Sequence, residues 1–235
     1  MQYQLIKTKR TSISLQVIAG KVVVRAPLSI NKSYIETFLS NKSSWIQARL
    51  SQQQLDKASQ NQLSVGGQIW FAGKLYPLVV TRGEVNQTCF DGKSITLTVK
   101  VTKALNTQPS LIPEIPDHLI KKRLESWFKQ QAQDYIIPRT NCYSQTMALI
   151  PKLITIRQYK ARWGSCNSLG NIQFNYLLMM APTWVVDYVI VHELSHLKYL
   201  NHSHQFWQVV EQYYPDFRLA KKWLKDHQRQ LQWTP

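Results

Sequence analysis

The stretch VVDYVIVHELSHLKYLNHSHQFW, residues 185–207, holds four of the chain's six histidines. Within it, His192, Glu193 and His196 form the pattern HExxH. Side chains four positions apart lie on one face of a helix, so both imidazoles can bind one metal ion. Glu193 lies beside the first ligand, where its carboxylate can reach a water on that ion. The pattern predicts metal-assisted hydrolysis, with zinc as the expected ion because its protein ligands include imidazole.

A third ligand has to come from outside HExxH, because catalytic zinc usually takes three protein ligands and a water. The candidates downstream are His202, His204 and Glu211. In an unbroken helix, His202 would lie off the ligand face, since each residue turns the helix by about 100°. Asn201 tolerates left-handed backbone and can end the helix, and Ser203 can cap the next one. A bend at 200–201 would bring His202 to the ion, whereas His204 would face solvent.

The N-terminal part of the chain alternates strand and helix patterns. Residues 3–26 indicate two strands around a turn at Ala19-Gly20. Residues 31–54 have apolar side chains near helical spacing, with Ser29 or Asn31 as the cap and a break near Asn41. Residues 57–100 return to strand patterns punctuated by glycine.

The C-terminal part begins after a segment with three prolines, TKALNTQPSLIPEIPD. A helix follows, which we expect to stop at Pro138. Next come two strands around a turn at Asn167–Asn171, and then helices from Thr183 onward. This order predicts an α+β fold. We expect a β-rich unit with a helix at 1–101, a linker or crossover at 102–117, and a helix–hairpin–HExxH-helix unit of the zincin-like type at 118–235.

Charge and cysteine content suggest partners and compartment. The 29 Lys and Arg residues exceed the 13 Asp and Glu residues, which gives a net charge of +16. A field of this sign favours nucleic acid or other anionic partners, although such charge also occurs on merely solvated faces. The three cysteines form no CxxC pair, and neither a signal peptide nor an apolar run of membrane-spanning length is visible. We therefore expect a cytoplasmic protein without a membrane partner.

Several ordered motifs resemble the YgjP-like metallopeptidase family, which is related to the SprT-like and WLM zinc proteases. The RWGSC motif is present at residues 162–166, followed by Gly170, Ile172 and Asn175 of GxIxxN. After HELSH come Asn201, His202, Ser203, Phe206 and Trp207. A looser likeness extends upstream over nearly the whole chain. The chain departs from many relatives at Tyr176 and Leu177, where those carry Trp and Arg.

The resemblance implies a zinc peptidase that cleaves a protein or peptide substrate, with His202 as the third ligand. Glu193 would act as general base, taking a proton from the attacking water and passing it to the leaving amine. Arg162, Trp163 and Asn175 are candidate substrate-binding residues. The strand at 170–176 is either an edge that pairs with an extended substrate or an ordinary hairpin strand.

Two other classes of protein stay open at this point. A basic nucleic-acid-binding protein could hold a structural zinc closed by a fourth ligand such as His204. A self-inhibited peptidase could act as an adaptor, although the complete motif offers this little support. By analogy with SprT-like relatives, the substrate could also be a DNA-bound protein, so DNA is a candidate partner.

Overall fold

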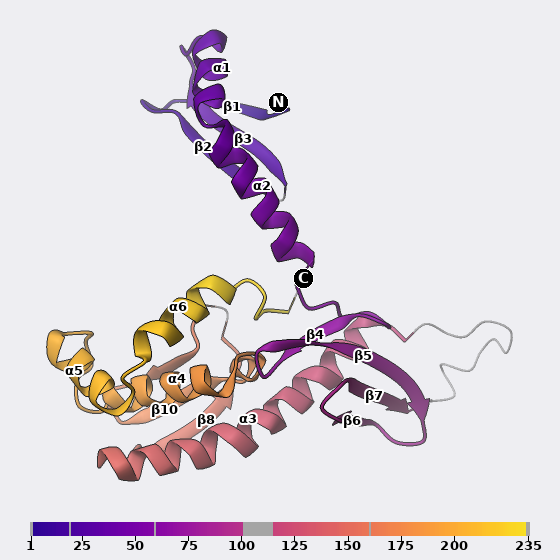
Figure 1. Cartoon of the computed structure of the whole chain (residues 1–235), viewed down its shortest axis with the longest axis vertical. Coiled ribbons are helices and arrows are strands. Elements are labelled where there is room, and N and C mark those ends of the chain that lie inside the picture. Colours follow the sequence, from indigo (N-terminus) through magenta and orange to yellow (C-terminus); the bar gives the residue numbers. More distant parts are fainter. Residues whose placement is uncertain (1, 19, 59, 101–114, 160, 234–235) are drawn as a thin grey trace, which may run out of the picture. The chain divides into compact units, whose positions relative to one another are not determined.

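The computed structural model describes residues 2–18, 20–58, 60–100, 115–159 and 161–233, and the chain divides into two compact units, Met1–Ser59 and Gln60–Pro235 (Figure 1). The described residues form three small sheets and six α-helices, which confirms the mixed α+β class. No helix among them combines the length and the apolarity that a membrane span requires.

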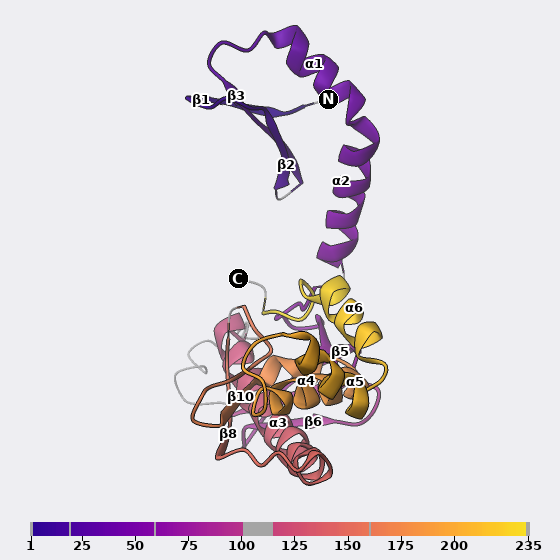
Figure 2. The same ribbon diagram turned by 90° about the vertical axis from the view of Figure 1, so that its left-hand side faces the viewer.

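Unit 1 pairs a three-stranded sheet with two helices (Figure 2): β1 (Gln4–Thr8), β2 (Ser14–Ile18), β3 (Lys21–Pro27), α1 (Lys32–Asn41) and α2 (Ser43–Ala58). β3 is central, parallel to β1 and antiparallel to β2. Its Val22 and Val24 pack with helix residues such as Ile35. The side chain of Asn31, one of the two predicted caps, caps α1 by accepting from the backbone N–H of Ser33 at 3.2 Å. The expected break also occurs, between α1 and α2.

The first sheet of unit 2 contains β4 (Gln68–Phe71), β5 (Lys74–Gly83), β6 (Gln87–Phe90) and β7 (Ile95–Lys100), in the order β4-β5-β7-β6. These strands pack with the C-terminal elements, so the compact units divide after Ser59, whereas the sequence suggests a boundary at 101. The reason is the shared core, in which Ile69 and Leu97 belong to the same cluster as Phe128. Most of the expected linker at 102–117 lies outside the described residues.

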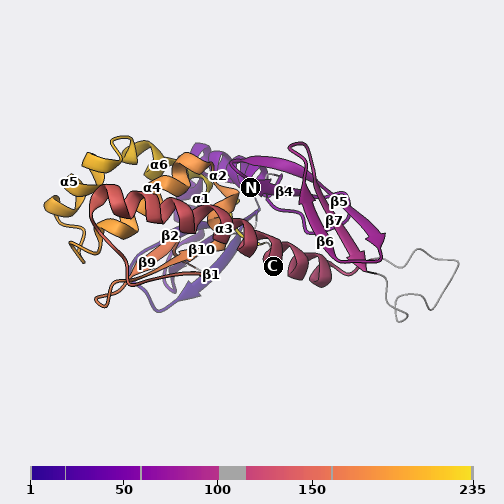
Figure 3. The ribbon, with the colours of Figure 1, turned by 90° about the horizontal axis from the view of Figure 1, so that it is seen from below.

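The long helix α3 (Asp117–Met147) runs through Pro138, so the prediction that it stops there is wrong. Proline removes the N–H that would bond to the carbonyl of residue 134. Asp134 is exposed, so water can satisfy that carbonyl. The turns beyond the proline are held by the buried side chains of Thr140, Ser144 and Met147. α3 extends from the four-stranded sheet to the second sheet of unit 2 (Figure 3).

The second sheet of unit 2 has three strands instead of the predicted two: β8 (Leu153–Arg157), β9 (Gly164–Cys166) and β10 (Asn171–Asn175). Their order is β8-β10-β9, with β10 parallel to β8 and antiparallel to β9. β10 is therefore central, and both of its edges are paired. The predicted turn at Asn167–Asn171 is present between β9 and β10, where Gly170 has a φ of 77°.

The remaining elements are the 3-10 helix η2 (Tyr176–Met180), α4 (Thr183–Ser195), α5 (His204–Tyr213) and α6 (Phe217–His227). All five residues of η2 are buried. The backbone N–H groups of Ala72 and Gly73 donate to the carbonyls of Met179 and Met180, both at 2.9 Å. These bonds tie the β4–β5 turn to the segment that leads into α4.

Candidate metal centre

The HExxH sequence lies in the second half of α4, the most enclosed helix of unit 2. Almost every residue of α4 from Val185 onward is buried, as expected for a helix that is apolar on all sides. Its buried Asp187 accepts from Arg139 of α3 at 2.8 Å and from the Tyr135 hydroxyl at 3.1 Å. This ion pair fixes α4 against α3 one and a half turns before the first histidine.

The chain turns sharply after α4 and returns toward it. α4 ends at Ser195, earlier than the bend expected at 200–201, and His196 lies at its C-cap. The Nδ1 of His196 donates to the Tyr199 carbonyl at 3.0 Å, since a carbonyl can only accept. Ser203 then caps α5 by accepting from the Phe206 N–H at 3.3 Å. The turn places His202 next to the two histidines of α4.

The imidazoles of His192, His196 and His202 form a compact triangle. Their ring centroids lie 4.8 to 5.0 Å apart, and the ligand atoms all lie within 4.8 Å of one another. Among the residues that the structure describes, no fourth His, Cys, Asp or Glu belongs to this cluster. Glu211 instead forms an ion pair with Arg218 at 2.7 Å, and His204 begins α5 in an exposed position.

The donor set fits a metal ion. The Nε2 atoms of His192 and His202 lie 3.1 Å apart. Two nitrogens at zinc-binding distances of about 2.0–2.1 Å would lie roughly 3.3 Å apart in a tetrahedral site. Because the His196 Nδ1 carries the proton shared with Tyr199, its Nε2 offers a free lone pair. The cluster is therefore a metal-binding triad whose two α4 members are held by a rigid helix.

Burial keeps the α4 imidazoles neutral, which is the state that binds metal. Burial, together with the neighbouring charges of His196, His202 and Lys221, lowers the pKa of His192 to about 3. Burial also lowers the pKa of His196, against the opposing hydrogen bond to Tyr199. Neither side chain needs to lose a proton at neutral pH before it binds an ion.

Glu193 is enclosed beside the triad, with 5% of its surface exposed. Its Oε2 is buried and has no hydrogen-bond partner among the described residues. Burial raises the pKa of Glu193 to about 8, and the positive charge of Arg162 opposes this shift. β9 covers the carboxylate at Gly164, where an added Cβ would lie 2.6 Å from Glu193 Oε1. Only glycine permits this close approach to Oε1. The other oxygen, Oε2, is the one without a partner and can accept a proton.

The candidate substrate-binding residues lie around the start of β9. The side chain of Asn175 donates to the carbonyls of Tyr159 at 3.0 Å and Arg162 at 3.2 Å. Its own carbonyl accepts from the Leu177 N–H at 3.1 Å, so the Asn175 amide is occupied in holding the loop. Arg162 is exposed, and Trp163 is partly buried directly before Gly164. All three candidates line one small pocket.

Cys166 of β9 also lies near Glu193, and it is a protonated thiol. Burial, with a smaller contribution from the charge of Glu193, raises the pKa of Cys166 to about 11. A thiol in this state is a poor nucleophile. Its surroundings therefore suit a packing role for Cys166 and not nucleophilic attack.

Phe206 has a role at the site that sequence reasoning missed. We expect it to be a core aromatic, and it is fully buried. Its ring also lies 4.9, 4.5 and 4.8 Å from those of His192, His196 and His202. The Phe206 ring thus packs against all three imidazoles. His202 lies before the first residue of α5, so helical spacing gave no signal for this contact.

The comparisons with known proteins agree with this geometry. The chain belongs to the YgjP-like metallopeptidase domain family, which it matches over residues 11–227. No curated protein matches the chain. Among solved structures, the chain is similar to the metallopeptidase zymogen of Pyrococcus abyssi abylysin, with 21% identity and a TM-score of 0.37. That match covers 40% of this chain and 96% of the other. The family resemblance found in the sequence is confirmed, and the protein is a metallopeptidase.

Proposed function

We propose that this protein is a zinc-dependent peptidase of the zincin-like type that hydrolyses bonds of a protein or peptide substrate. The observation that carries the proposal is the triad of His192, His196 and His202 beside a buried carboxylate with one unpartnered oxygen. These three imidazoles would hold the ion. Because all three are uncharged when they bind, they leave the charge of the cation undiminished.

Bound zinc supplies a Lewis acid that lowers the pKa of a ligated water towards about 7 and polarises a carbonyl. Glu193 takes a proton from the attacking water on its free Oε2 and passes it to the leaving amine. Burial raises the pKa of Glu193 to about 8 in the metal-free protein, and the positive charge of a bound ion would favour the ionised form that accepts this proton. Gly164 keeps the carboxylate in place by packing against it.

β9 is the strand that can align an extended substrate. The sequence suggests 170–176 for this role, but β10 is flanked by β8 and β9 and has no free edge. In the described part of the sheet, β9 is an edge strand, and its Gly164 lies against Glu193. Main-chain pairing with β9 would lay a peptide across the carboxylate with little dependence on its sequence.

The alternative of a closed structural zinc site requires a fourth protein ligand. His204 was the candidate, and it is not part of the cluster in the described structure. A structural site also offers no reason for a buried carboxylate with an unpartnered oxygen, an arrangement that costs about 1–3 kcal/mol. Both observations favour the open, catalytic site.

The test is metal content by mass spectrometry for wild type, His202→Ala and His204→Ala, alongside cleavage of casein and a peptide library. We expect about one zinc per chain in wild type and in His204→Ala, loss of zinc in His202→Ala, and cleavage that a chelator stops. Loss of zinc in both variants, without cleavage by wild type, would establish the closed structural site instead.

A further inference from the structure

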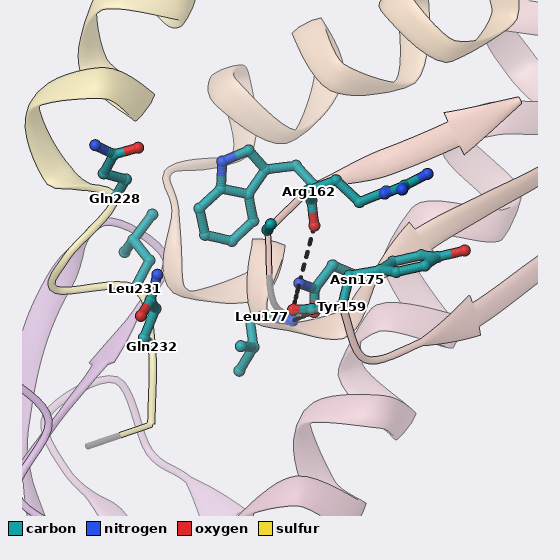
Figure 4. A pocket seen from close by; sticks show the side chains of 9 residues that line it. Tyr159, Arg162, Asn175, Leu177, Gln228, Leu231 and Gln232 are labelled. Atoms are coloured by element: carbon teal, nitrogen blue, oxygen red, sulfur yellow. Dashed lines mark hydrogen bonds between the residues drawn. The ribbon is translucent and has the colours of Figure 1, made fainter. Parts of the chain in front are cut away.

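A small pocket lies beside the start of β9 (Figure 4). Its volume is about 70 Å³. One wall is the segment around Arg162 and Trp163, the base includes Leu177, and the other wall is the C-terminal segment with Gln228, Leu231 and Gln232. The pocket joins segments that are more than fifty residues apart in the sequence.

The pocket is close to the proposed site of hydrolysis. Trp163 lines it and immediately precedes Gly164, the residue that packs on Glu193. An extended chain advances about 3.3 Å per residue. A peptide paired with β9 would therefore present a side chain to this pocket within two residues of the bond that Glu193 serves.

Both walls are held by hydrogen bonds, so the pocket does not need to be formed by the substrate. On one side, the N–H of Asn175 donates to the Trp163 carbonyl at 2.8 Å, and its side chain holds the Arg162 carbonyl. On the other side, the buried side chain of Asn61 donates to the carbonyls of Gln230 and Gln232, both at 2.8 Å. A preorganised subsite costs a ligand little ordering entropy.

Size and lining chemistry define the occupant. A cavity of about 150 Å³ holds benzene, so a pocket of about half that volume holds roughly three heavy atoms. The amides of Gln228 and Gln232 can donate and accept, while Leu177 and Leu231 supply apolar surface. In Figure 4, the charged end of Arg162 points away from Gln228 and Leu231, and it lies over the ring of Tyr159, so among the described lining residues no cation faces the C-terminal wall.

We propose that this pocket is a specificity subsite for a small, neutral, polar side chain of the substrate, of the Ser, Thr or Asn class. The subsite rests on the proposed peptidase function and names the substrate preference of that same site. Leu177 gives the pocket an apolar, uncharged base.

The first test is cleavage of a peptide library by the zinc-loaded protein. We expect Ser, Thr or Asn to be enriched at one position within two residues of the cleaved bond. Ala161 lines the rim and is exposed, so Ala161→Phe fills the pocket without disturbing the core. This variant should lose the enrichment, and its kcat/KM for the best peptide should fall about tenfold relative to the Gly-substituted peptide. The matched control Gln133→Phe, on the exposed face of α3, should keep it.

A second readout is independent of turnover. Metal-free Glu193→Gln protein should bind the best fluorescein-labelled peptide several-fold more tightly than its Gly-substituted analogue, and adding Ala161→Phe should abolish that difference. Cleavage with no preference at these positions, or a preference that Ala161→Phe leaves intact, overturns the subsite alone. Failure of the zinc-loaded protein to cleave any peptide overturns the proposed function, and the subsite with it.

Discussion

The two units differ in what they carry: unit 2 holds the candidate metal centre, whereas unit 1 has more positive charge for its length. Unit 2 contains all six histidines and a cluster of 35 buried apolar residues that surrounds α4. Among its described residues, unit 1 has a cluster of six buried apolar side chains, yet its 59 positions carry nine Lys and Arg against two acidic residues, a net +7. Unit 2 has 20 against 11, a net +9 over 176 residues. Precise placement of reactive groups needs a large core, whereas attraction of an anionic partner needs only surface charge.

Exchanging one carboxylate in each unit should give the largest contrast. Glu193→Gln should reduce peptide cleavage by about 10²- to 10⁴-fold, because the amide cannot accept the proton of the attacking water. Zinc content should stay near wild type, since Glu193 is outside the triad. Glu36→Gln in unit 1 should leave cleavage unchanged. Retained turnover in the zinc-loaded Glu193→Gln protein would remove Glu193 from the mechanism.

Adding one methyl group to a glycine in each unit should give the next largest effect. Gly164→Ala places a Cβ 2.6 Å from Glu193 Oε1, so the carboxylate or β9 has to move. A displacement of about 1 Å can cost about 10²-fold in rate, and we expect a loss of this order. Gly20→Ala meets nothing within 4 Å and strains only a positive φ of 74°. It should cost about 1 kcal/mol of stability without slowing peptide cleavage. Equal cleavage rates for both variants would contradict the contact with Glu193.

The ion pairs of the two units should also differ. Asp187→Asn removes the carboxylate charge from the ion pair with Arg139. The side chains of Asp187 and Arg139 are 10% and 43% exposed, respectively. We expect a loss of about 2 kcal/mol in the free energy of unfolding, less than for a fully buried pair. The Lys32–Glu36 pair of unit 1 is 79% and 59% exposed. Glu36→Gln should therefore change stability by less than about 0.5 kcal/mol. Urea unfolding of both variants measures the difference.

The pH dependence of the free energy of unfolding of the metal-free protein should show the raised pKa of Glu193. Its pKa rises from 4.5 to about 8 on folding, so the native state retains a proton that the unfolded chain has lost. Stability should therefore fall as pH rises from 6.5 to 8, by about 2 kcal/mol at most. His192 and His196 oppose this decline only near pH 6.5, because folding lowers their pKa values and the unfolded imidazoles lose their protons just above that pH. In urea unfolding with a chelator, Glu193→Gln should lack this decline; parallel curves would contradict it.

The smallest expected effect concerns the charge of unit 1. Lys21 and Arg25 alternate with Val22 and Val24, which face the helices, so both cations lie on the opposite side of the sheet. We propose that this face contacts DNA phosphates. Replacing both residues with Gln should lower the slope of log affinity against log salt by about 2, without changing peptide cleavage. Lys93→Gln with Lys100→Gln in unit 2 is the matched control. An unchanged slope, or no DNA binding at low salt, would refute the proposal.

Features that depend on neighbours in the chain were predictable. The pairing of His192 with His196, the cap at Asn31 and the turn before Gly170 all follow from spacing within four residues. The third histidine required a reversal of direction, for which Asn201 and Ser203 gave a local signal. Asn201 and Ser203 predicted a bend at 200–201, which is later in the chain than the observed end of α4. The helix ends at Ser195, because His196 bonds to the Tyr199 carbonyl directly after it.

Other features depend on which segments meet in space, and the sequence does not contain that information locally. Pro138 does not end α3, because tertiary packing on both sides holds the helix. Strands before and after residue 60 have similar patterns, yet only the latter share the core of α4. The central place of β10, the role of Phe206 under three imidazoles, and a pocket built from residues 159–177 and 228–232 follow from the same cause. Local spacing therefore determined the metal-binding chemistry of this protein. Long-range packing decided which strand lies at the edge of the sheet beside Glu193 and which segments form the pocket next to it.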